Sequence, residues 1–147
     1  TLLDRSSARV EFLEQSVKQL DVADNVDVVE GDATELAHND LYRGLFDGVF
    51  CRAFGPPPVT AECAIGFLGV AGRLIVSEPP EASTRRWPLT SLKTLGFTDV
   101  EMIDGPPRFA KLVVVTPPGR DVPRTWKQIS IICRVSNLLK RHLFQKH

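Results

Sequence analysis

The strongest constraint on the fold is an alternation along the chain between short apolar runs and segments with helical periodicity. The short runs are typical of strands, whereas the other segments repeat apolar residues three or four positions apart, as helices do. Strands are expected at residues 1–3, 26–29, 46–52, 73–78, 97–103 and 110–116, and helices at residues 6–20, 34–37, 59–68 and 85–95. This order predicts an α/β fold with a mostly parallel sheet.

The residues between these segments predict where the chain turns. The prolines at 56–58 force a turn before the third helix, and the Gly-Val-Ala-Gly sequence at 69–72 is expected to form a turn into the fourth strand. Gly96 is expected to end the last helix. No helical pattern separates the last two strands, so they are expected to be antiparallel neighbours. The predicted sheet is therefore mostly parallel with a final antiparallel strand.

Composition favours one globular domain that acts in the cytoplasm. The chain has 147 residues, of which 43% are hydrophobic and 24% are charged, the balance of a domain that can bury a core. No apolar run approaches the roughly 20 residues needed to span a bilayer, and charged residues interrupt any signal-peptide pattern near the amino terminus. Cys51, Cys63 and Cys133 are few and odd in number, which favours reduced thiols over a disulfide framework.

The net charge of zero hides a division between the two ends of the chain. Residues 1–105 carry nine Lys and Arg against 17 Asp and Glu, whereas residues 106–147 carry nine Lys and Arg against Asp121 alone. Residues 119–147 form a basic tail in which apolar residues from Ile132 to Leu143 recur at helical spacing. A basic amphipathic helix could bind RNA phosphates, lie on an anionic membrane or dock on the acidic part of the same protein.

Three charged side chains follow expected strands at their carboxyl ends, the edge where open α/β sheets bind ligands. Asp4 could accept hydrogen bonds from both hydroxyls of a ribose, and Asp32 could accept one from an exocyclic amine such as that of adenine. Both could instead be helix caps. Arg52 could hold a carboxylate or an RNA phosphate, or it could pair with Asp47 or Glu78 at the sheet edge.

Several short motifs together resemble one enzyme family. They are TLLD at residues 1–4, RVEFL at 9–13, VVEGDA at 28–33, FDGV at 46–49, RAF at 52–54 and GRL at 72–74. Over residues 1–116 the chain resembles class I S-adenosylmethionine-dependent methyltransferases, which have a Rossmann-like sheet. More narrowly, it resembles the glucose-inhibited division protein B family, the 16S ribosomal RNA guanine-N7 methyltransferases G. The Arg-Ala-Phe motif is the most specific of these elements.

The resemblance implies a cofactor, a substrate and a set of contacts. The family uses S-adenosylmethionine to methylate the N7 of a guanine in 16S ribosomal RNA. It contacts the cofactor through a glycine-rich loop, a residue pair after the third family strand and an arginine after the fourth. In this chain the pair would be Ala33 and Thr34, and the arginine Arg52, beside Asp4 and Asp32. The family often has Arg-Ala-Glu where this chain has Asp32-Ala33-Thr34, so a glutamate contact is absent.

One expected element of the family has no counterpart in the sequence. No Gly-x-Gly loop precedes Thr1, and the strand before that loop lies in the family at the centre of the sheet, between the strands ending here in Asp4 and Arg52. The resemblance thus implies a partial methyltransferase domain at residues 1–118, missing the first strand and followed by the tail at 119–147. We expect a truncated form that binds the cofactor weakly.

Substrate contacts are expected after the strand that ends in Arg52. Guanine N7 has a free lone pair, so methyl transfer to it needs alignment more than a general base, and no catalytic residue is assigned. Phe54 could stack on a base or belong to the core. Arg124 lies in a Pro-Arg segment that resembles the family's basic segment near RNA. The three histidines do not share ligand spacing with the cysteines, so no metal is expected.

Other functions are compatible with the same sequence. A small-molecule methyltransferase of the same fold would show no salt-sensitive RNA binding. A non-catalytic remnant or RNA-binding module would give no heat with S-adenosylmethionine. An NAD-binding oxidoreductase would use Asp4 equally well but leaves the Arg-Ala-Phe motif unexplained. The oligomeric state stays open.

Overall fold

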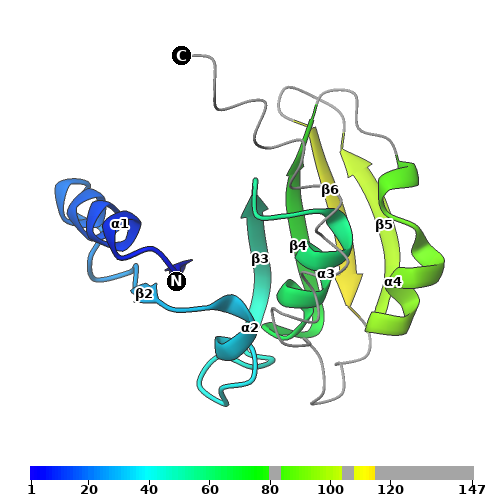
Figure 1. Ribbon diagram of the computed structural model, residues 1–147, viewed down its shortest axis with the longest axis horizontal. Coiled ribbons are helices and arrows are strands. Elements are labelled where there is room, and N and C mark those ends of the chain that lie inside the picture. The colour runs from blue at the N-terminus through cyan, green and yellow to red at the C-terminus, as the bar shows by residue number, and fades with distance from the viewer. Residues whose placement is uncertain (80–83, 104–107, 115–147) are drawn as a thin grey trace.

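The computed structural model describes residues 1–79, 84–103 and 108–114, and within them the strands form two separate sheets (Figure 1). A parallel pair contains β1 (Leu2–Asp4) and β2 (Val28–Glu30). A four-stranded sheet has the order β3-β4-β6-β5. Its strands are β3 (Phe46–Arg52), β4 (Leu68–Glu78), β5 (Phe97–Ile103) and β6 (Arg108–Val114). The expected order of strands and helices is confirmed.

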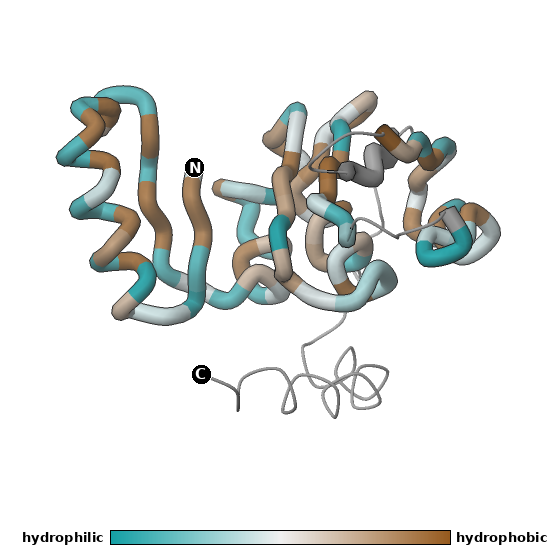
Figure 2. The backbone as a smooth tube through the Cα atoms, turned by 90° about the horizontal axis from the view of Figure 1, so that it is seen from above, coloured by the Kyte–Doolittle hydropathy of each residue, from teal (hydrophilic) through white to brown (hydrophobic). Residues whose placement is uncertain are grey.

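The smaller unit is a β-α-β arrangement at the amino end of the chain. Helix α1 (Ser7–Gln19) connects the two strands and buries Val10 and Val17, but leaves Phe12 66% exposed. Each strand is only three residues long. Figure 2 shows α1 alternating between hydrophilic and hydrophobic positions, with an apolar strand at the N label. This unit therefore has an apolar side but little core of its own.

The larger sheet confirms the predicted mixture of strand directions. Strand β3 is parallel to β4, whereas β6 is antiparallel to both β4 and β5. Helices α3 (Pro57–Ile65) and α4 (Leu89–Leu95) follow β3 and precede β5, and Gly96 ends α4 in the left-handed region at φ 102°. A short helix α2 (Ala33–Leu36) lies between the two sheets in the sequence.

The hydrophobic core lies in the larger unit. Side chains from α3 and α4 pack there against side chains from strands β4 and β5. This packing holds the two helices against the sheet. Leu74 at the centre of β4 and Phe97 at the start of β5 are both fully buried. The cluster of buried residues is Ala61, Ala64, Ile65, Leu68, Leu74, Val76, Trp87, Leu92 and Phe97.

The turn expected at residues 69–72 is wrong, because these residues belong to β4. They form an irregularity in the ladder: Phe46 pairs with Leu68, but Gly48 already pairs with Arg73. A Cβ at Gly69 would lie 2.9 Å from the Gly44 carbonyl oxygen, and one at Gly72 would lie 2.8 Å from the Gly69 carbonyl oxygen. The glycines thus permit a bulge inside a strand rather than a loop between elements.

The helix expected at residues 85–95 is interrupted. A 3-10 helix, η1 (Thr84–Arg86), precedes Trp87 and Pro88, and α4 starts only at Leu89. Pro88 lacks the amide hydrogen that a continuous helix would need. The interruption directs Trp87, which is only 2% exposed, toward the end of β4, where its Nε1 donates to Glu78 Oε1 at 3.1 Å.

Strand β3 is found where a strand is expected, but it is more exposed than its apolar sequence suggests. Phe50 is 73% exposed and Arg52 is exposed as well. Among the described strands, β3 pairs only with β4, so its other edge is open. The apolar sequence of a central strand is therefore found on a strand that is an edge of its sheet.

Candidate functional site

Asp4 lies at the carboxyl end of β1, in register with Glu30 of β2. Its Oδ2 accepts a hydrogen bond from Arg9 Nε at 2.7 Å, and its Oδ1 accepts one from the Ser6 backbone amide at 2.9 Å. The hydrogen bond from Arg9 holds the pKa of Asp4 below its ordinary value. Asp4 is thus an ionised acceptor that also supports the start of α1, and each oxygen can accept a further bond.

Asp32 is the N-cap of α2. Its Oδ1 accepts from the Thr34 backbone amide at 2.8 Å and from Thr34 Oγ1 at 2.6 Å, and Thr34 is only 4% exposed. Its Oδ2 accepts no hydrogen bond from the described residues. The capping role considered from the sequence is present, and one carboxylate oxygen is left for another donor.

The chain reverses sharply after β3, within the Arg-Ala-Phe motif. Ala53 has φ 51°, in the left-handed region that residues other than glycine rarely adopt. Such conformations concentrate at functional sites. Arg52 is exposed at the strand end and forms no ion pair with another described residue.

Neither ion pair considered for Arg52 is found in this structure. Glu78 is 7% exposed, and its Oε2 instead pairs with Arg86 at 2.9 Å, while Trp87 donates to Oε1. Asp47 is exposed on the first half of β3, away from the strand end that carries Arg52. Among residues 1–79, 84–103 and 108–114, no carboxylate forms an ion pair with the guanidinium of Arg52.

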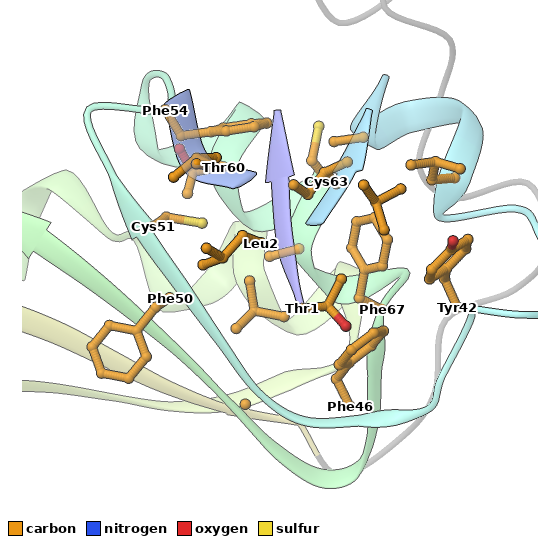
Figure 3. A pocket seen from close by; sticks show the side chains of 18 residues that line it. Thr1, Leu2, Tyr42, Phe46, Phe50, Cys51, Phe54, Thr60, Cys63 and Phe67 are labelled. Atoms are coloured by element: carbon orange, nitrogen blue, oxygen red, sulfur yellow. The ribbon is translucent and has the colours of Figure 1, made fainter. Parts of the chain in front are cut away.

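A cavity of about 440 Å³ lies between β1 and β3 (Figure 3). Thr1 to Leu3 line it from the smaller sheet, and Phe46 and Gly48 to Cys51 line it from the larger one. Ala33 and Phe54 also contribute to its wall. We call this space the β1–β3 cleft. It brings together two of the residues proposed from the sequence, Ala33 and Phe54.

Aromatic side chains close one part of the cleft. In Figure 3, Tyr42, Phe46 and Phe67 lie near one another, whereas Phe54 lies beside Thr60 in another part of the wall. Phe46 and Phe67 pack edge to face with their centroids 6.1 Å apart. Sequence reasoning missed the first group, because its members come from loops and strand starts that become neighbours only in the fold.

The cysteines show no sign of an activated thiol. Burial raises the pKa of the Cys51 thiol to about 11, so it is protonated at neutral pH. Cys63 is buried, forms no disulfide with Cys51 and lines the cleft together with it. Among the described residues, no group of three or more His, Cys, Asp or Glu side chains could hold a metal ion. These thiols serve as apolar packing groups.

Part of the predicted site lies outside the described residues. Arg124, Cys133 and the whole tail at 119–147 belong to that part of the chain. The boundary between residues 118 and 119 lies there as well. Within the described segments, no helix is both long and apolar enough to cross a membrane.

Curated relatives confirm the resemblance seen in the motifs. The chain is 38% identical over 76 residues to the ribosomal RNA small subunit methyltransferase G of Leuconostoc citreum, a match that covers 52% of this chain and 31% of the relative. The enzyme of the same name from Clostridium tetani is 32% identical over 82 residues, covering 56% and 34%. The chain therefore spans about a third of the length of the curated relatives it matches. No family model matches it.

Solved structures confirm the fold. A SAM-dependent O-methyltransferase from Thermotoga maritima has a TM-score of 0.58 at 13% identity, covering 80% of this chain and 50% of that one. A putative rRNA-methylase from Clostridium thermocellum has a TM-score of 0.53 at 16% identity, covering 78% and 71%. With two separate sheets in place of one, the chain has an incomplete Rossmann-like methyltransferase fold.

Proposed function

We propose that this chain contributes to an S-adenosylmethionine-dependent methyltransferase that modifies the N7 of a guanine in 16S ribosomal RNA. The similarity to ribosomal RNA small subunit methyltransferases G over about half of the chain carries this proposal. The left-handed Ala53 supports it, because it gives the Arg-Ala-Phe motif a shape that holds Arg52 at the strand end.

The side chains at the strand ends suit the parts of this cofactor. Ionised Asp4 can accept the ribose hydroxyls, and the free oxygen of Asp32 can accept from the adenine amine. The pair Ala33 and Thr34 follows Asp32 directly, with Thr34 already fixed by the cap. Arg52 offers a cation for the carboxylate of the methionine part.

The chemistry places few demands on the protein. The bound sulfonium supplies an electrophilic methyl group, and guanine N7 offers its lone pair without prior loss of a proton. The protein therefore has to align the two groups and exclude water, which fits the absence of an assigned base. Phe54, 39% exposed, would stack on the base, and Arg124 would contact an RNA phosphate.

Cofactor binding tests the first half of the proposal. Titration of the chain with S-adenosylmethionine, followed by calorimetry and backbone NMR, should give saturable binding with shifts at Asp4, Asp32 and Arg52. Arg52→Ala should weaken binding about tenfold, since a charge-assisted hydrogen bond is lost. Arg73→Ala is the matched control. Arg73 is also an exposed arginine, but it lies on β4 opposite Gly48, near the start of β3, whereas Arg52 lies at the end of β3. A folded chain that binds no S-adenosylmethionine would refute the proposal and support a non-catalytic module.

Methyl transfer tests the second half. Radiolabelled methyl groups should enter 16S ribosomal RNA at a guanine whose N7-methylated form is recognised by aniline-induced strand cleavage after reduction. RNA binding should weaken steeply with added salt. Cofactor binding without salt-sensitive RNA binding would favour a small-molecule methyltransferase, and binding of NAD in place of S-adenosylmethionine would favour an oxidoreductase.

A further inference from the structure

A buried carboxylate at the carboxyl end of β4 holds an exposed arginine. Glu78 is the last residue of β4, is 7% exposed and accepts a hydrogen bond from Trp87 Nε1 at 3.1 Å. Arg86 Nη1 lies 2.9 Å from Glu78 Oε2, while the side chain of Arg86 remains 39% exposed. We propose that Glu78 is a positioning residue for Arg86, and that Arg86 and the adjacent Arg85 bind phosphates of the RNA. This inference rests on the proposed function and names where the protein holds its substrate.

The burial of Glu78 indicates that the carboxylate fixes the geometry of its partner. A buried ion pair contributes little to stability, because each charged group loses its water. Here the carboxylate is held from two sides, by Trp87 and by Arg86. An arginine side chain has much rotamer freedom to lose when it binds a ligand, so fixing it beforehand lowers the entropy cost of binding. Glu78 thus gives Arg86 one orientation before the RNA binds.

The two arginines present their charges to solvent. Arg86 contacts Glu78 through Nη1, whereas a guanidinium carries five N–H donors in one plane. Arg85 is exposed as well and belongs to the same 3-10 turn, η1. Arginine can contact phosphate oxygens through two parallel N–H groups. Two exposed guanidinium groups on one turn therefore suit a polymer of phosphates.

These arginines lie at the end of the larger sheet that carries Arg52. Strands β3 and β4 are parallel, so Arg52 and Glu78 are at the same end, where β5 also ends (Figure 1). Arg52 pairs with Ser77, one position before Glu78. Successive side chains of a strand point to opposite faces, so Arg52 and Glu78 leave the sheet on different sides. Arg52 can therefore contact the cofactor while Arg86 contacts the RNA.

The charge at this end of the sheet differs from that of the surrounding chain. Residues 1–105 carry nine Lys and Arg against 17 Asp and Glu, so a polyanion is attracted only where cations gather. Three of the nine, Arg52, Arg85 and Arg86, are exposed here. A membrane-binding segment would also expose apolar side chains beside its cations, but the neighbouring Trp87 is only 2% exposed. These features favour RNA over an anionic membrane.

The salt dependence of RNA binding tests the two arginines. In filter binding of radiolabelled 16S ribosomal RNA to the full chain, each phosphate contact should contribute about 0.7–0.9 to the slope of log affinity against log salt concentration. Arg85→Ala should weaken binding about fivefold at low salt and reduce the slope by one such contribution. Arg73→Ala again serves as the matched control, because Arg73 is an exposed arginine away from this end of the sheet. The basic residues of the tail are the same in every variant and cancel in the comparison.

The direction of the effect of Glu78→Gln tests the positioning role. This substitution removes a negative charge, so charge alone predicts tighter RNA binding. If Glu78 positions Arg86, binding should instead weaken about threefold, because the guanidinium is no longer held in one orientation. In an Arg86→Ala background, Glu78→Gln should not weaken binding, and this double variant leaves no buried carboxylate without its partner. Thermal unfolding checks that each variant is folded. Tighter binding of Glu78→Gln would show that Glu78 competes with the RNA for Arg86 and would contradict the inference.

The possible outcomes separate this inference from the proposed function. If the unsubstituted chain binds 16S ribosomal RNA but Arg85→Ala and Arg86→Ala bind it like Arg73→Ala, the inference is wrong and the proposed function stands. A folded chain that binds no RNA would overturn both. If Arg85 and Arg86 are needed for sedimentation with phosphatidylglycerol vesicles and not for RNA binding, the partner is a membrane and the inference is wrong. Loss of two phosphate contributions from the slope when both arginines are replaced, with unchanged binding of S-adenosylmethionine, supports it.

Discussion

The two units of this chain contain the same kind of local structure, but they differ in strand length and in how many side chains they bury. Both contain a parallel strand pair connected through a helix, but the strands of the smaller unit have three residues and those of the larger unit have seven or more. The larger unit buries Leu74, Trp87 and Phe97 in one cluster. In the smaller unit, α1 buries only Val10 and Val17. A β-α-β arrangement therefore gains a core only when further strands and helices cover it.

The largest predicted difference between the units is in the free energy of unfolding that each loses when a buried side chain is shortened to alanine. Leu74→Ala should destabilise the larger unit by about 2–5 kcal/mol, because Leu74 is fully buried among α3, α4 and the sheet. Val17→Ala in α1 should cost clearly less, because that buried side chain packs in a unit whose two strands have only three residues each. Urea unfolding followed by tryptophan fluorescence and by far-ultraviolet circular dichroism measures both. Equal losses would show that the units share one core.

A polar contact in the larger unit should have the next largest effect. Trp87→Phe removes the Nε1 donor to the buried carboxylate of Glu78 and should cost about 1–3 kcal/mol. In a Glu78→Gln background, the same substitution should cost less, because no charged acceptor is then left without its donor. The double-mutant cycle from urea unfolding gives the coupling. A coupling of zero would mean that the contact contributes nothing.

The cap between the two units should have a moderate effect. Asp32→Ala removes the acceptor for the Thr34 amide and hydroxyl and should cost about 0.5–2 kcal/mol. Asp32→Asn keeps a capping oxygen and should cost much less. Thermal unfolding of the two variants gives the comparison. If both variants lose the same stability, the charge of Asp32 matters and the cap does not.

The smallest effect is expected from pH in the smaller unit. The folded-state pKa of Asp4 lies below its ordinary value of 3.8, chiefly because Arg9 donates to it. Its stabilising contribution is therefore complete above 3.8 and is lost as the pH falls through the lower folded-state pKa. Acid titration followed by NMR signals of β1 and α1 should show this loss, and Asp4→Asn should abolish it. An unchanged titration in Asp4→Asn would assign the effect to another group.

Local pattern was enough to predict the order of elements, and long-range packing decided the rest. The helix from Ser7 to Gln19 and the left-handed Gly96 follow from periodicity and capping, which act within a few residues. The bulge at 69–72 could not be predicted, because Gly69 is needed there only through its approach to Gly44. A Gly-Val-Ala-Gly sequence viewed alone is typical of a turn.

In the candidate site, too, local sequence pattern predicts individual residues but not how distant parts of the chain pack together. Asp4, Asp32 and Arg52 were proposed from their positions at strand ends, and those positions are found. The cap made by Asp32 and the ion pair of Asp4 with Arg9 follow from spacing along the chain. The cleft itself depends on which strands lie side by side without pairing, and the exposure of Phe50 follows from that arrangement. No local pattern carries this information.

Site-resolved amide hydrogen exchange of the free chain tests the difference between the two units most directly. Amides in the β4–β6 ladder should exchange only through global unfolding, at the full free energy of unfolding, because both strands lie inside the larger sheet. Amides in the β1–β2 pair and in α1 should exchange through local opening at a lower free energy, independent of urea at low concentrations. A single common free energy for both units, with the same urea dependence, would contradict the account.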